Sequence, residues 1–201
     1  MKLLHIDSSI LDEGSASRAV TKEIVSRLQE SSPGLEVQYL DLATAPLPHL
    51  TGASLARADE VEAARDARAL ADFQAADVVV IGAPMYNFGV PTQLKAWIDR
   101  ILVAGKTFRY TASGPEGLAG GKRVIVATSS GGVYGQNAPG EHVEAYLKFI
   151  FGFIGVTDLT VLRAEGLAIS PENRQKGLDT ALAAIPATVA RATALATTLA
   201  A

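Results

Sequence analysis

The stretch VVVIGAPMYNFGVP, residues 78–91, decides the fold predicted for this chain. It begins with four consecutive β-branched apolar residues, and glycine and proline follow almost at once. A strand that is apolar on both faces is typical of a parallel sheet covered by helices on each side, whereas a half-solvated antiparallel sheet gives an alternating pattern. We therefore expect residues 78–81 to form a central strand of an α/β domain.

Four other short segments read as strands, and helical patterns separate them. The expected strands cover residues 3–7, 35–40, 78–81, 124–128 and 159–162. This alternation predicts an α/β fold with a doubly wound, five-stranded parallel sheet, right-handed crossovers and helices on both faces. Ligands in that architecture bind beyond the carboxyl ends of the strands, so the loops that follow the strands are the candidates for a site.

Helical patterns cover residues 20–28, 54–76, 92–104 and 181–201. Pro91 can open the third of these helices, and Gly105 can end it, because proline suits a first helical position and glycine suits the position after the last. Pro186 predicts a kink or a break in the last helical stretch.

Residues 1–201 are expected to form one domain, because a chain with 48% hydrophobic and 19% charged residues can bury one sizeable core. A net charge of −3 argues against nucleic acid as a partner. The absence of cysteine excludes disulfides, thiolate nucleophiles and iron–sulfur clusters. The apolar runs are too short for a signal peptide or a membrane span, so no membrane insertion and a cytoplasmic location are expected.

The first loop, residues 8–18, carries the hydroxyl groups of Ser9, Ser15 and Ser17 to the start of the first helix. Unpaired backbone N–H groups at a helix start favour an anion, so this loop is a candidate phosphate site. The alternative is that Ser15 or Ser17 simply caps the helix. No G-x-G-x-x-G follows the first strand and no P-loop occurs, which disfavours Rossmann-type NAD binding and ATP binding.

The second loop, residues 83–91, places Met85, Tyr86, Asn87 and Phe88 between two prolines. A planar heterocycle needs flat apolar contact on one face and a few fixed polar groups at its edge, and these residues supply both. The alternative is a proline-stiffened loop whose aromatic side chains cover the end of the sheet.

The third loop, residues 128–134, contains Ser129, Ser130, Gly131 and Gly132, and its paired glycines permit close backbone approach to a ligand. The three loops follow the first, third and fourth expected strands, so one fold places a phosphate site and two walls of a flat pocket around a single crevice.

No metal site is expected. His5, His49 and His142 lie far apart in the sequence and form no H-E-x-x-H or similar ligand pair. No G-x-S-x-G elbow occurs, which leaves a serine hydrolase or a transferase of the same architecture as an alternative without a recognised motif.

Several motifs resemble a known family. They are PMYNF at residues 84–88, TQLK at 92–95, KTFRYT at 106–111, GPEGL at 114–118 and FGFIG at 151–155. Together they resemble the FMN-dependent NADH azoreductases, a branch of the flavodoxin-like NAD(P)H:quinone oxidoreductases. The resemblance implies a sheet order of 2-1-3-4-5 and a homodimer with one FMN in each subunit.

The resemblance also assigns roles to residues. The positions that match the family's phosphate site are Ser9, Ser15, Ala16 and Ser17. Those that match its flavin-ring site are Pro84, Met85, Tyr86, Asn87, Phe88, Ser129, Ser130, Gly131 and Gly132. Those that match the aromatic residues closing its acceptor site near the dimer interface are Tyr110 and Phe153.

The implied reaction is a ping-pong transfer of hydride from NADH, or NADPH, through flavin N5 to quinones and aromatic azo compounds. The cofactor carries this chemistry, so no essential acid or base is expected, and Asn87 is the candidate for stabilising the reduced ring. A preference for NADPH would need a cation that binds its 2′-phosphate, such as Arg18 or Arg57. The alternative is a flavodoxin-like electron carrier or an FMN-binding regulatory module without NADH turnover.

Overall fold

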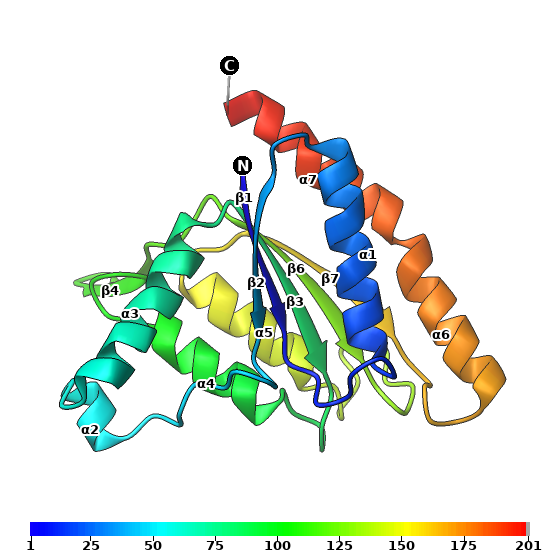
Figure 1. The fold of residues 1–201 in the computed structure, drawn as a ribbon, viewed down its shortest axis with the longest axis horizontal. Helices are drawn as coiled ribbons and strands as arrows, with labels where there is room; N and C mark the ends of the chain where they lie inside the picture. The colour runs from blue at the N-terminus through cyan, green and yellow to red at the C-terminus, as the bar shows by residue number, and fades with distance from the viewer. Residues whose placement is uncertain (200–201) are drawn as a thin grey trace.

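The computed structural model describes the backbone of residues 1–199 and the side chains of residues 1–193, so the last two residues of the expected C-terminal helix lie outside it. The chain forms a central parallel sheet in the order β2-β1-β3-β6-β7 (Figure 1). Its strands are β1 (Lys2–Asp7), β2 (Glu36–Asp41), β3 (Val78–Pro84), β6 (Arg123–Ser129) and β7 (Asp158–Ala164). Because β6 and β7 are the fourth and fifth strands of this sheet, the expected order 2-1-3-4-5 is confirmed.

Helices cover both faces of the sheet (Figure 1). One face carries α3 (Glu60–Ala75), α4 (Thr92–Ile101) and α5 (Val143–Phe153), and the other carries α1 (Ala16–Ser31), α6 (Pro171–Ala183) and α7 (Ile185–Leu199). Among the described residues, no helix has the length and apolar character needed to cross a membrane.

The central strand β3 shows why the apolar run predicts this architecture. Val79 and Ile81 face the core beneath α3, α4 and α5, whereas Val78 and Val80 face the core beneath α1, α6 and α7. Successive side chains of a strand point to opposite faces, so a strand covered on both sides is apolar at every position.

The expected helix over residues 54–76 is wrong in one respect, because it is interrupted. A short helix, α2 (Gly52–Leu55), ends before α3, and Arg57 lies between them with a φ of 52°. The Asp59 carboxylate then accepts hydrogen bonds from Val61 N and Glu62 N, at 2.8 and 2.9 Å, and starts α3 as its N-cap.

The helix that follows Pro91 ends three residues earlier than expected. Thr107 Oγ1 donates to the Ile101 carbonyl at 2.7 Å and accepts from Val103 N at 3.0 Å, so a side chain takes the place of the next helical turn. The break expected at Pro186 is confirmed, because α6 ends at Ala183 and α7 begins at Ile185.

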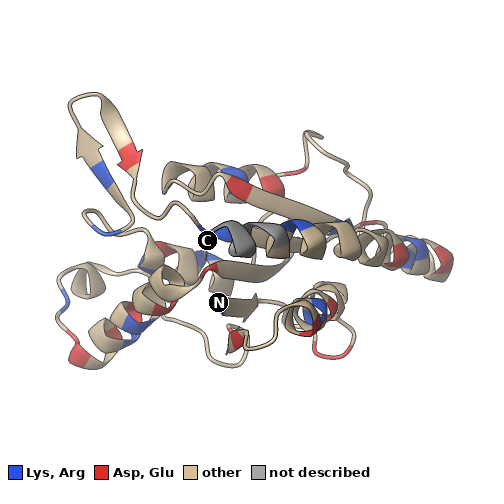
Figure 2. Cartoon of the chain, turned by 90° about the horizontal axis from the view of Figure 1, so that it is seen from above, with Lys and Arg blue, Asp and Glu red and all other residues tan. Residues whose placement is uncertain are grey.

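A β-hairpin that the sequence pattern does not predict follows α4. Its strands, β4 (Phe108–Thr111) and β5 (Gly114–Gly117), pair antiparallel, and Figure 2 shows them standing clear of the neighbouring helices. Gly117 fastens the hairpin to the end of α5, since a Cβ at this position would lie 2.2 Å from Gly155 N. Ala119 N also donates to Ile154 O at 2.8 Å. The hairpin therefore depends on a backbone-to-backbone contact between distant segments.

Candidate functional site

The first, second and third loops meet at the carboxyl edge of the sheet. Ser8 Oγ, at the end of β1, donates to Gly82 O of β3 at 2.6 Å. The Tyr86 hydroxyl lies 3.2 Å from Ser9 Oγ, and Met85 N donates to Ser129 O at 2.7 Å. The structure thus brings together the residues that the sequence predicts for the phosphate end and the ring end of one site.

The first loop caps α1 and leaves backbone donors free. Ser15 Oγ accepts from Arg18 N at 3.2 Å as the N-cap, and it lies 3.2 Å from Ser17 Oγ. Within the described residues, the N–H groups of Ala16 and Ser17 have no protein acceptor. The capping alternative therefore holds for Ser15, while two adjacent amides are still available to an anion at the positive end of the helix.

Arg18 holds the first loop in place. Its Nη2 donates to Ser9 O at 2.8 Å, and both of its terminal nitrogens bind the Asp41 carboxylate at 2.8 and 3.0 Å. The hydrogen bonds with Asp41 raise the pKa of Arg18 although burial opposes them. Burial alone would raise the pKa of Asp41, but the bonds from Arg18 and the Ala43 amide leave it below its usual value.

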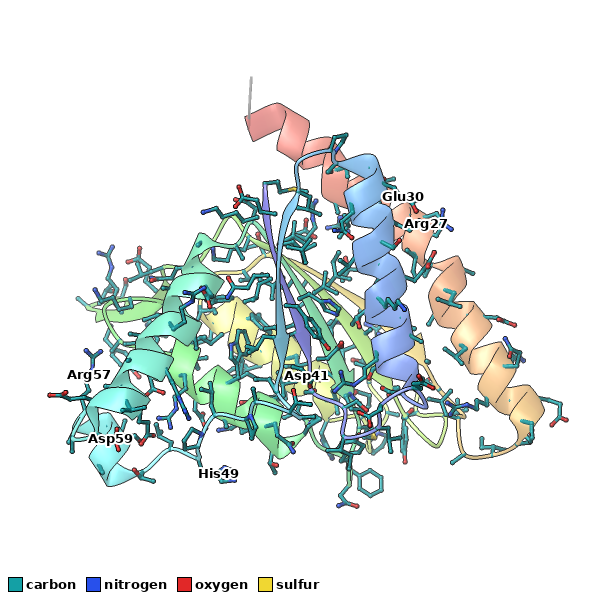
Figure 3. All side chains as sticks on the ribbon, viewed as in Figure 1. Arg27, Glu30, Asp41, His49, Arg57 and Asp59 are labelled. Carbon is teal, nitrogen blue, oxygen red and sulfur yellow. The ribbon has the colours of Figure 1, made fainter. Side chains whose placement is uncertain are left out.

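These contacts bear on the two cations considered for a nicotinamide 2′-phosphate. Arg18 is committed to Asp41 and Ser9. Arg57 lies at the corner between α2 and α3, well apart from Asp41 at the end of β2 (Figure 3). Neither arginine therefore combines a position beside the first loop with a guanidinium group free to bind a phosphate.

Replacing Asp41 by asparagine should lower the free energy of unfolding at pH 7 by about 1 kcal/mol, because Arg18 loses a charged acceptor at a partly exposed site. A carboxylate whose folded pKa is lowered contributes stability above its unfolded pKa and loses it as the pH falls through the folded value. The difference between wild type and variant should therefore be full at pH 7 and should begin to shrink as the pH falls below about 4. Urea unfolding between pH 3 and 7 measures it, and a pH-independent difference would contradict the assignment.

The second loop contains a two-residue hairpin turn. Tyr86 N donates to Gly89 O at 3.0 Å, and Gly89 N donates to Tyr86 O at 3.1 Å. The two central residues, Asn87 and Phe88, have φ values of 50° and 67°. Positive φ at both positions defines a type I′ turn, which favours Asn followed by Gly, so a phenylalanine at the second position is strained. Phe88 is also 52% exposed, so burial in the core does not explain it.

The third loop can offer the amides of its two glycines to a ligand. The carbonyl groups of Ser130, Gly131 and Gly132 all accept hydrogen bonds from the segment that follows β7. In the part of the chain that the structure describes, the N–H groups of Gly131 and Gly132 have no protein acceptor. The face of Gly131 that a side chain would occupy is filled by Ala168, because a Cβ would lie 3.1 Å from Ala168 Cβ. The loop can therefore offer two backbone donors to a flat ligand at close range.

Tyr110 and Phe153 lie near each other but not beside the three loops of the same chain. Phe108 links them, with ring centroids 5.6 Å from Tyr110 and 4.9 Å from Phe153. They belong to the hairpin and to the end of α5, on the side of the molecule away from the strand ends where α1 begins (Figure 1). Tyr110 is 75% exposed. Within one chain, these aromatic residues therefore form a separate surface.

Sequence reasoning missed the role of Arg18 in the loop and overlooked Glu165, which binds two amides at the end of the third loop. Glu165 had a signal, because it directly follows the fifth strand, whose carboxyl end lies beside that of the fourth. Among the described residues, no group of three or more His, Asp or Glu side chains could hold a metal ion.

The comparisons with known proteins agree with this geometry. A family model described as a flavodoxin-like fold matches residues 1–189. FMN-dependent NADH:quinone oxidoreductase 2 of Bradyrhizobium diazoefficiens is 57% identical over 195 residues, covering 92% of this chain and 96% of that protein. The FMN-dependent NADH:quinone oxidoreductase of Methylorubrum extorquens is 54% identical over 201 residues, covering 93% of this chain and 98% of that protein.

A solved structure with a similar fold also belongs to an FMN-dependent enzyme. The FMN-dependent NADH-azoreductase of Bacillus anthracis, solved in complex with FMN, matches with a TM-score of 0.86 at 28% identity. The match covers 94% of this chain and 98% of that one. The chain belongs to the flavodoxin-like family of the FMN-dependent NADH:quinone oxidoreductases.

Proposed function

We propose that this protein is an FMN-dependent oxidoreductase that transfers electrons from NADH to quinones and aromatic azo compounds. The observation that carries the proposal is the meeting of three loops at the carboxyl edge of the sheet, with free amides at both ends of one site. The names of the relatives, which act as NADH:quinone oxidoreductases or azoreductases, support the same chemistry.

The residues fit FMN. The amides of Ala16 and Ser17, with the hydroxyl groups of Ser9, Ser15 and Ser17, would bind the phosphate. The ring would lie between the second and third loops, against residues 84–88 and 129–132. A side chain on Gly131 would displace either Ala168 or the loop itself, so the position of this loop depends on a glycine here.

When bound, FMN supplies the redox chemistry by accepting hydride from NADH and passing electrons to the acceptor, in a ping-pong cycle. The protein's contribution is to orient the ring and stabilise the charge that develops on it. The Asn87 amide and the N–H groups of Gly131 and Gly132 would donate to the ring, and donors fixed in advance stabilise a developing negative charge without reorganising. Protons would come from water, so no side chain is assigned as an essential acid or base.

We further propose a homodimer in which the hairpin serves the neighbouring subunit's site. Tyr110 and Phe149 are 75% and 70% exposed, which is unusual for large apolar side chains on helix α5 and the adjoining hairpin. Tyr110 and Phe153 lie away from the strand ends of their own chain, so a second copy would be needed to bring them to an acceptor. The cytoplasmic location and the single-domain organisation stay predictions.

The visible spectrum of FMN-loaded protein tests the function. Under anaerobic conditions, NADH should bleach the flavin band rapidly, and a benzoquinone added afterwards should restore it fully. Free FMN with NADH at the same concentrations is the control. A protein that binds no flavin would contradict the site, whereas bound FMN that NADH cannot bleach would favour the electron carrier or the regulatory module.

A further inference from the structure

The segment after β7, residues 165–169, acts as a template for the third loop. Leu167 N donates to Ser130 O at 3.1 Å, Ala168 N to Gly131 O at 3.0 Å, and Gly166 N to Gly132 O at 2.8 Å. Each carbonyl from Ser130 to Gly132 is therefore fixed by a backbone donor. Because carbonyl and N–H groups of one peptide point in opposite directions, the template also sets where the free amides of the third loop point.

Glu165 extends this template with its side chain. Its Oε1 accepts hydrogen bonds from Tyr134 N at 3.0 Å and from Gly135 N at 2.9 Å. Hydrogen bonds to an ionised acceptor are about twice as strong as neutral ones. Within the described residues Glu165 makes no ion pair with a lysine or an arginine, so these two amides are the partners of its carboxylate.

Tyr134 connects the third loop to the second. Its ring packs over two glycines, since Cβ atoms at Gly132 and Gly140 would lie 3.3 and 3.1 Å from it. It also meets Phe88 edge to face, with ring centroids 6.0 Å apart. The amide that Glu165 binds therefore belongs to the residue that links the two proposed walls of the ring site.

The backbone of Glu165 is held independently of its side chain. α6 packs against it so closely that a Cβ at Gly177 would lie 2.2 Å from the Glu165 carbonyl oxygen. Substitutions of the Glu165 side chain should thus leave the segment in place and act on the third loop alone.

We propose that Glu165 is a positioning residue for the flavin ring. It acts by fixing the Tyr134 and Gly135 amides, which sets the third loop and, through Tyr134, the Phe88 wall. The inference rests on the proposed function. Glu165 should affect how the protein binds the ring of the ligand, and it should not affect how Ser15 to Ser17 bind the phosphate.

Titration of the apoprotein with FMN and with riboflavin tests this, because the two share the ring and differ in the phosphate. Glu165→Ala should raise both dissociation constants by the same factor of about ten, since two charge-assisted hydrogen bonds are lost. Glu165→Gln keeps an oxygen acceptor but loses its charge, so it should raise both dissociation constants by about threefold. Glu30→Ala, which removes the same charge at the far end of α1 (Figure 3), should change neither.

The results separate the two proposals. Wild-type apoprotein that binds neither flavin would overturn the proposed function itself. A wild type that binds both, with a Glu165→Ala variant that binds them equally well or loses affinity for FMN alone, would overturn only the positioning role. Equal losses in the Ala and Gln variants would also overturn it, as would an unfolded Ala variant beside a Gln variant with unchanged binding.

Discussion

Replacing Arg100 by methionine should lower the free energy of unfolding by about 3 kcal/mol, because it leaves two partly buried carboxylates without the buried cation that pairs with them. The Arg100 side chain is only 2% exposed, and it lies 2.6 Å from Glu62 and 3.1 Å from Asp66. It also donates to Pro48 O at 2.9 Å, so it ties α4 to α3 and to the loop before α2. Equilibrium urea unfolding at pH 7 measures the loss.

The loss of unfolding free energy caused by Arg100→Met should become smaller as the pH falls. Burial already raises the pKa of Asp66 in the wild type, although Arg100 opposes it. Without Arg100, the folded-state pKa of this carboxyl rises further, so the folded variant binds more protons than the unfolded one and gains stability toward acid. The deficit should therefore be smaller at pH 5 than at pH 7. A deficit that grows toward acid would contradict this account.

Arg27→Met provides the matched control. Arg27 pairs with Glu23 at 2.8 Å on the exposed face of α1 (Figure 3). Exposed pairs on a helix are screened by water and contribute little, so this variant should unfold like the wild type. A loss equal to that of Arg100→Met would show that removing any arginine destabilises the chain, and that burial is not the cause.

The sheet could be predicted from the sequence because its central strand contains a run that is apolar at every position. Residues 78–81 lie between two cores, and that environment leaves a mark at every position. The hairpin has no comparable apolar pattern in its sequence. β4 and β5 are four residues each and contain no buried residue, and Arg109 pairs with Glu116 across them at 2.8 Å. Its position depends on Gly117 meeting Gly155, a contact between segments that local patterns do not report.

Some features of the candidate site could likewise be predicted from the sequence, and others could not. The three loops could be predicted because parallel strands bring their carboxyl ends to one edge. The function of Arg18 could not, because it requires Asp41 of β2 to lie opposite Asp7 of β1 in the sheet register. The strained turn at Asn87 and Phe88 was also hidden, because sequence alone does not show that both residues have positive φ.

Replacing Asn87 by glycine should raise the dissociation constant of FMN about tenfold, because it removes the side-chain amide that we propose donates to the ring. Glycine adopts positive φ without strain, so the turn from Tyr86 to Gly89 keeps its shape. Asn87→Ala should weaken FMN binding at least as much, and it should also lower the free energy of unfolding by about 1 kcal/mol, because alanine is strained in the left-handed region. Flavin fluorescence titration and urea unfolding measure the two effects separately.

Phe88→Gly separates the turn from the wall that it presents. Glycine at the second position completes the favoured Asn-Gly type I′ turn, so the apoprotein should be no less stable than the wild type even though the Phe88–Tyr134 contact is lost. The ring site loses an aromatic wall, so FMN should bind more weakly. Loss of FMN affinity with stability retained would show that the strain at Phe88 is kept for ligand binding. If Asn87→Gly and Phe88→Gly both bind FMN as the wild type does, neither Asn87 nor Phe88 contributes to binding the ring.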